Sequence, residues 1–142
     1  MFLMKRFTSK TQKTGEVGEK LTKKFLMKRG FKILETNYTK KFGEIDIVAK
    51  EDRVYHFIEV KSVSCDLSAQ AGNLKLVTQE TLSVRPEENM HPKKIEKFVR
   101  TVQYYLVEKG VSDETPYQID LALVYIDKVK KQGRVSLMEN II

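Results

Sequence analysis

The most informative segment of this chain runs from Gly43 to Lys61 and reads G-E-I-D-I-V-A-K-E-D-R-V-Y-H-F-I-E-V-K. Two apolar, β-branched runs flank a polar turn at residues 51–53, a pattern that predicts a hairpin with strands over 42–50 and 54–62. Paired strands inside a small domain bury much of their length. A charged side chain within these runs therefore requires a partner or a function.

Three such charged side chains stand inside the two expected strands. Asp46 lies in the first strand, and Glu59 and Lys61 lie in the second. Side chains two residues apart share a face of a strand, so Glu59 and Lys61 point the same way. A pair of carboxylates can hold a hard cation, and an ammonium group beside it can stabilise charge on a phosphate. This combination is typical of metal-dependent phosphodiester hydrolysis.

The register of the hairpin decides whether the two carboxylates meet. A two-residue turn at Asp52–Arg53 would place Asp46 directly opposite Glu59, with Cβ atoms ~4.5–5.5 Å apart. A turn at Glu51–Asp52 would make them diagonal neighbours, ~7–8 Å apart. A regular three-residue turn would place them on opposite faces, unless a bulge restored the register. The register is therefore the structural test of this hypothesis.

With the carboxylates together, the site suits Mg²⁺ or Mn²⁺. Asp46, Glu59 and the backbone carbonyl of Val60 would supply the protein oxygens of the coordination shell. Lys61 would orient the attacking water, assist its deprotonation or stabilise the charge of the transition state.

The other elements predict an α/β fold with a small mixed sheet. Helical spacing of apolar residues predicts one helix from about Thr14 to Arg29 and another from Pro92 to Lys109. Residues 1–13 are expected to form a flexible basic arm ahead of a single domain over 14–142, and 63–90 a mobile loop. The other expected strands or extended segments are 31–37, a short one at 75–77, 117–126 and 134–138.

The first helix offers a further carboxylate. Its apolar stripe is expected to contain Val17, Leu21, Phe25 and Leu26. At 100° per residue, Glu19 lies about 20° from Leu26 at the edge of the stripe, whereas Glu16 points to solvent. Glu19 is therefore expected to lean over the sheet, where it would complete the site or hold a second metal.

Composition indicates a soluble protein with a polyanionic partner. Hydrophobic residues make up 41% and charged residues 32% of the 142 residues, as in globular domains. No apolar run approaches the ~20 residues of a membrane span, and the single cysteine fits a reducing compartment, so a cytoplasmic location is expected. Net charge is +7, and residues 1–40 alone carry 11 Lys/Arg against 3 Glu. This excess favours nucleic acid, although a solvated lysine-rich tail has the same composition.

These motifs resemble those of the YraN-like family of small bacterial proteins. The matching segments are Gly18–Glu19, Phe25–Leu26, Gly30–Phe31, Asn37, G-E-I-D-I, E-V-K, H-P-K-K at His91–Lys94, Tyr105–Leu106 and Ile119–Asp120. That family is classed with endonucleases of the PD-(D/E)XK type and is akin to archaeal Holliday-junction resolvases. The resemblance spans most of the chain and implies a restriction-endonuclease-like core. Val63 and Gln118 depart from it, since the family commonly has arginine there.

The resemblance also implies roles for individual residues. Asp46, Glu59 and Lys61 match the nuclease motif, and Glu19 matches the helix glutamate of the resolvase-like branch. A homodimer follows only by analogy, because a junction offers two symmetric scissile strands.

The sequence thus predicts a Mg²⁺- or Mn²⁺-dependent DNA endonuclease, with branched or junction DNA as a candidate substrate. Two other classes stay open: a non-catalytic nucleic-acid-binding module on the same fold, and an assembly protein that meets an acidic partner through its basic arm. The expected phosphate contacts are Lys94 and Lys97 in the second helix and Lys10 and Lys13 in the arm. Tyr104 is a candidate for stacking on a base, although helical aromatics more often pack in the core. His56 is expected to be structural, and Asp120 has no assigned role.

Overall fold

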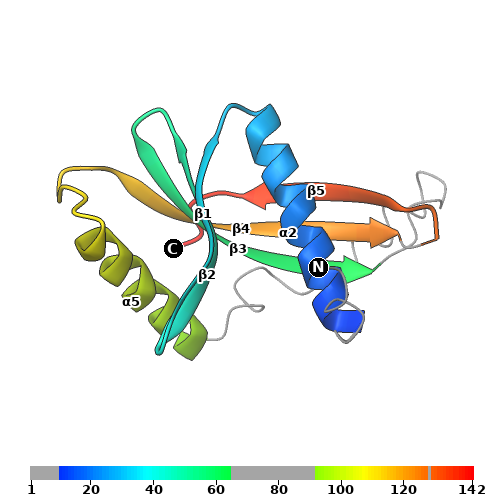
Figure 1. The fold of residues 1–142 in the computed structure, drawn as a ribbon, viewed down its shortest axis with the longest axis horizontal. Helices are drawn as coiled ribbons and strands as arrows, with labels where there is room; N and C mark the ends of the chain where they lie inside the picture. Colours follow the sequence, from blue (N-terminus) through cyan, green and yellow to red (C-terminus); the bar gives the residue numbers. More distant parts are fainter. Residues whose placement is uncertain (1–9, 65–91, 128) are drawn as a thin grey trace, which may run out of the picture.

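The predicted hairpin forms part of a five-stranded mixed sheet (Figure 1). The computed structural model describes residues 10–64, 92–127 and 129–142. Within this part of the chain the helices and strands are α2 (Lys10–Lys28), β1 (Lys32–Lys40), β2 (Gly43–Glu51), β3 (Val54–Ser64), α5 (Pro92–Glu108), β4 (Tyr117–Asp127) and β5 (Gln132–Met138). The prediction of an α/β fold with a mixed sheet is confirmed.

The observed bounds correct several of the expected ones. The first helix begins at Lys10, inside the segment 1–13 that was expected to be a flexible arm. β3 continues to Ser64, beyond the expected start of a loop at residue 63, because its last residue still pairs with Ile126 of β4. Residues 1–9, the rest of the expected loop to residue 90 and the expected strand at 75–77 lie outside the described residues.

The strands follow the order β1-β2-β3-β4-β5 across the sheet. Neighbouring strands are antiparallel except β3 and β4, which run parallel. A parallel pair requires a crossover connection, and α5 lies on the connection between these two strands. This crossover brings the first turn of α5 beside the central strands.

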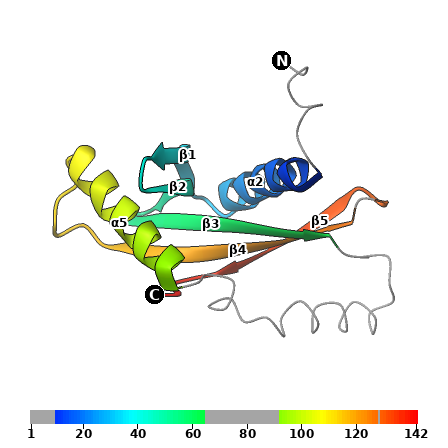
Figure 2. The same cartoon turned by 90° about the horizontal axis from the view of Figure 1, so that it is seen from below.

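Helices α2 and α5 cover opposite faces of the sheet, as the alternation of side chains along β2 and β3 requires (Figures 1 and 2). Val48 and Phe57 point to the face covered by α5, and Ile47 and Ile58 point to the face covered by α2. The predicted stripe of α5 is confirmed, because its members are buried or partly buried against the first face: Ile95, Phe98, Val99, Val102, Tyr105 and Leu106. No helix in the described segments is long and apolar enough to span a membrane.

The sheet-facing stripe of α2 differs from the expected one. Val17 is 41% exposed, whereas Gly18, Thr22 and Leu26 are buried. A Cβ atom at Gly18 would collide with Ser62 Oγ, so the missing side chain lets the helix approach β3 closely. Sequence periodicity placed Val17 on the side of α2 that faces the sheet. The short distance between α2 and β3 instead requires Gly18 on that side. The helix is thereby rotated relative to the predicted stripe.

Candidate metal-binding and catalytic site

The β2–β3 hairpin has the two-residue turn at Asp52–Arg53 that the metal-site hypothesis requires. Glu51 pairs with Val54 across this turn, and the pairing continues along the hairpin without a shift. One step beyond the last pair, the same register places Asp46 opposite Glu59. Of the registers that the sequence left open, the structure has the one that places the carboxylates directly opposite each other, and the three-residue turn that would separate them is excluded.

The two strands part beside these carboxylates. The β2–β3 pairing ends at Ile47 and Ile58, whereas β3 stays paired with β4 as far as Ser64. Beyond that point, Asp46 Oδ2 accepts a hydrogen bond from the backbone N–H of Val60 at 2.8 Å. The N–H and C=O of one strand residue point to the same side, so the Val60 carbonyl faces the same gap between the strands.

The carboxylates of Asp46 and Glu59 are close enough to influence each other strongly. Glu59 is 9% exposed and Asp46 is partly buried. Burial and the neighbouring charge of Glu59 raise the pKa of Asp46 to about 8, although the hydrogen bond from Val60 acts in the opposite direction. The negative charge of Glu19 acts in the same direction as that of Glu59. The site therefore concentrates negative charge that a proton or a cation would neutralise.

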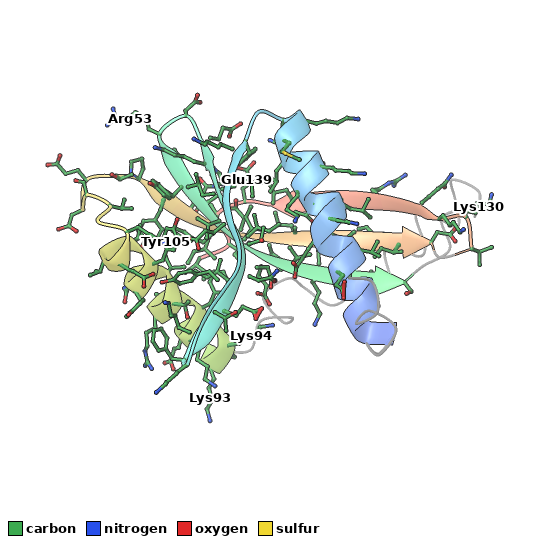
Figure 3. All side chains as sticks on the ribbon, viewed as in Figure 1. Arg53, Lys93, Lys94, Tyr105, Lys130 and Glu139 are labelled. Carbon is green, nitrogen blue, oxygen red and sulfur yellow. The ribbon has the colours of Figure 1, made fainter. Side chains whose placement is uncertain are left out.

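A lysine from α5 already contacts this acidic pair. Lys94 Nζ lies 2.7 Å from Glu59 Oε2, and the glutamate side chain is far less exposed than that of the lysine, 12% against 46%. Figure 3 shows Lys94 at the first turn of α5, on the side of that helix that faces α2, while Lys93 points outward. The sequence predicted Lys94 near a phosphate but did not predict this ion pair.

A cavity of about 300 Å³ opens at the same place. It is lined by Gly43, Glu44, Asp46, Glu59, Lys94, Lys97 and Phe98. The sequence reasoning missed Glu44, although its position two residues before Asp46 on one strand places both side chains on the same face. The cavity therefore combines carboxylates from β2 and β3 with two lysines from α5.

Glu19 approaches from the other helix, as expected. It is partly buried, whereas Glu16 is exposed. Burial raises the pKa of Glu19, and a hydrogen bond with Asn37 opposes this change. Helix α2 covers the face of the sheet opposite to α5. The charge of Glu19 therefore raises the pKa of Asp46 from the other side of the sheet, where β2 and β3 part. Glu19 does not line the cavity itself.

Lys61 is not among the residues that line the cavity. Lys61 is exposed on β3, two residues after Glu59, and has no ion-pair partner among the described residues. Lys10 and Lys13 lie in the first turns of α2, and their side chains fall outside the described part of the structure.

A second polar cluster lies elsewhere on the sheet. His56 Nδ1 is 2.6 Å from Asp120 Oδ2, and both side chains are buried. Ligand atoms of His56, Asp120 and Glu139 all lie within 4.8 Å of one another, so this group could hold a metal ion. The other Asp120 oxygen accepts hydrogen bonds from Gln118 Nε2 at 3.0 Å and from the Asn140 backbone N–H at 2.9 Å. His56 thus has the structural setting expected for it, and Asp120 gains a partner that the sequence did not reveal.

Comparison with known sequences places these features in a family. Residues 18–124 match the sequence profile of uncharacterised protein family UPF0102. The chain belongs to this family. The UPF0102 protein of Campylobacter fetus subsp. fetus (strain 82-40) is 39% identical over 122 residues, which cover 86% of this chain and 92% of the relative. The UPF0102 protein of a Nitratiruptor species is 36% identical over 127 residues, covering 89% and 90%.

Membership of UPF0102 confirms the resemblance to the YraN-like family. The matched segment contains Glu19, Asp46, Glu59, Lys61 and Lys94. The family is uncharacterised, so membership supplies a relationship without an activity.

The raised pKa of Asp46 predicts a pH-dependent effect of Asp46→Asn on the stability of this UPF0102 protein. The pKa is about 8 in the folded protein, against ~3.9 in an unfolded chain. Between these values the folded state binds more protons than the unfolded state, so wild-type stability falls as pH rises through the window. Asparagine does not ionise and escapes this loss.

Thermal unfolding at several pH values measures the effect. The melting temperature of Asp46→Asn, relative to wild type, should increase from pH 4 to pH 9 by at least several degrees. Asp113→Asn, in an exposed loop, should show a far smaller change. A wild-type–variant difference that stays constant with pH would contradict the prediction.

Proposed function

We propose that this chain is a divalent-metal-dependent endonuclease that hydrolyses phosphodiester bonds in DNA. The observation that carries the proposal is the meeting of Asp46 and Glu59 beside one cavity that also has Lys94 and Lys97 in its wall. Carboxylates alone would suit many metal sites. Their combination with lysines from a facing helix suits an anionic substrate such as a phosphodiester.

The residues present fit a Mg²⁺ or Mn²⁺ ion. Asp46 and Glu59 would hold it together with the Val60 carbonyl, and all three offer the oxygen ligands that hard cations prefer. The raised pKa of Asp46 supports this fit, because a cation relieves the same crowding of negative charge that a proton relieves. When bound, the metal would polarise the phosphate and lower the pKa of a coordinated water.

The lysines of the site would act on the substrate. Lys94 and Lys97 line the cavity and would offset the repulsion between a DNA phosphate and the carboxylates. Lys61 shares the strand face of Glu59, and it would orient the attacking water or stabilise the charge that develops on the phosphate. Glu19 would complete the site from α2 as a further carboxylate that stabilises a bound cation.

The Lys94–Glu59 ion pair favours one alternative function, a nucleic-acid-binding module without catalysis. An ammonium group 2.7 Å from Glu59 already neutralises one of the carboxylates that would hold the metal. If this pair persists in solution with Mn²⁺ present, the cavity would bind a phosphate backbone without cleaving it.

Incubation of the purified protein with labelled duplex, single-stranded, flapped and four-way-junction DNA separates the two functions. Products that form with Mn²⁺ or Mg²⁺ and disappear with EDTA support the nuclease. Binding without products, at any metal concentration, supports the binding module. If the protein forms no products and binds none of these DNAs, both functions are rejected. Size-exclusion chromatography with light scattering, with and without junction DNA, tests the homodimer that a resolvase-like action would require.

A further inference from the structure

An aromatic pair lies next to the cavity on the outer side of α5. Tyr104 is 45% exposed, and its ring centroid is 5.4 Å from that of Phe42 at an interplanar angle of 65°. Tyr105, the next residue, is 3% exposed and belongs to the core. The packing role that is usual for a helical aromatic is therefore filled by Tyr105, while Tyr104 presents ring surface to solvent.

Close packing fixes this pair relative to the cavity. Phe42 lies in the turn between β1 and β2, and the next residue, Gly43, lines the cavity. A Cβ atom at Gly43 would collide with Thr101 Oγ1 and would lie 3.1 Å from the Lys97 carbonyl oxygen. The turn therefore rests directly on α5, and the aromatic pair forms a rigid extension of the cavity wall.

Basic side chains connect the cavity with the aromatic pair. Lys97, Arg100 and Tyr104 are all exposed and follow the i, i+3, i+7 spacing of one helix face. From Lys94 to Tyr104 the helix rises ~15 Å. Lys40 of β1 lies beside the pair, with its Nζ 5.4 Å from the centre of the Tyr104 ring and 3.1 Å from Glu108 Oε2. We call Lys94, Lys97, Arg100, Tyr104 and Phe42 the α5 strip.

We propose that the α5 strip binds an unpaired DNA strand, which makes DNA with a single-stranded segment the substrate class of this protein. Cations that track a backbone, followed by an exposed aromatic on which a base stacks, are the features of single-strand binding. Bases inside a duplex are already stacked and leave no face for Tyr104. This proposal rests on the proposed function, because the strip can guide a substrate into the cavity only if the cavity is the nuclease site.

Fluorescence anisotropy of the full chain with labelled DNA in EDTA tests the strip without cleavage. Tyr104→Ala should weaken binding of a single-stranded oligonucleotide about 10-fold, and duplex binding less than about 2-fold. Tyr104→Phe should keep wild-type affinity, since its ring still stacks. Lys97→Gln and Arg100→Gln should each lower the slope of log affinity against log salt by about 0.7 on single strands.

Matched controls separate the strip from general effects. Tyr117→Ala removes a tyrosine of similar exposure, 42%, from the start of β4, and it should leave single-strand affinity unchanged. Arg53→Gln removes a cation from the β2–β3 turn at the far corner of the molecule (Figure 3), and it should leave the salt slope unchanged.

The outcomes distinguish this proposal from the nuclease. If Tyr104→Ala weakens single-strand binding but wild type cleaves no DNA with Mn²⁺, the strip stands and the catalytic function fails. If wild type cleaves DNA but Tyr104→Ala binds single strands as wild type does, the strip is overturned. Equal losses of duplex and single-strand affinity, or a loss for Tyr117→Ala as large as that for Tyr104→Ala, would also overturn it.

Discussion

Replacement of Glu59 by glutamine is expected to lower metal-dependent DNA cleavage by about 10³-fold without lowering the melting temperature. Glutamine removes a charged metal ligand, and losses of one group that stabilises a transition state cost about 10²–10³-fold in rate. The same change relieves repulsion with Asp46 above pH 8, where that carboxyl group is ionised, and it leaves Lys94 able to reach solvent. Stability should therefore hold or rise.

A panel of variants gives this prediction its controls. Lys61→Gln should lower the cleavage rate about 10²-fold. It should have little effect on metal affinity, because Lys61 is not a metal ligand in the proposed site. Glu51→Gln, at the opposite end of β2, should cleave as wild type does. Single-turnover cleavage with Mn²⁺ and thermal unfolding measure the two effects. Cleavage by Glu59→Gln at the wild-type rate would show that the products come from another site or another protein.

Asp120→Ala is expected to destabilise the fold by about 3–5 kcal/mol. The Asp120 carboxylate is fully buried and is bonded to His56, Gln118 and the backbone N–H of Asn140. Its removal leaves the buried His56 without its partner and the N–H groups of Gln118 and Asn140 without this acceptor, which weakens the attachment of the segment after β5 to β4. For a chain of this length, the melting temperature should fall by roughly 10 °C or more.

Glu139→Ala serves as the matched control, because Glu139 belongs to the same cluster but is exposed. It should lower the melting temperature by no more than a few degrees. A stabilisation by Zn²⁺ or Mn²⁺ that wild type shows in the same unfolding curves and Glu139→Ala loses would show that the cluster holds a metal. An Asp120→Ala protein as stable as Glu139→Ala would contradict the assigned structural role.

Local features of the sequence were sufficient to predict much of the fold. The α5 stripe follows from apolar spacing alone, and the burial of Glu19 relative to Glu16 follows from its angle on the helix. The same reasoning was wrong for Val17, because periodicity ranks side chains by hydrophobicity. It does not register that the close approach of α2 to β3 requires the absence of a side chain at Gly18.

The features that the sequence could not predict join residues far apart in the chain. Lys94 reaches Glu59 across the β3–β4 crossover, and His56 meets Asp120 because the two strands are parallel neighbours. Neither partner can be chosen from spacing, since crossover length does not fix which residues become neighbours. The aromatic pair of Phe42 and Tyr104 arises in the same way, from a turn packed on a helix.

The sequence by itself determined that a two-residue turn between the strands would bring Asp46 and Glu59 to the same face, while the place of the turn, at Asp52–Arg53, came from the structure. A short turn and the two-residue period of a strand leave few alternatives, so these are local constraints. Only the tertiary structure decided that β2 and β3 part beside these carboxylates and that Lys94 pairs with Glu59. Those features depend on how α2 and α5 pack on opposite faces of the sheet, which is a property of the whole fold.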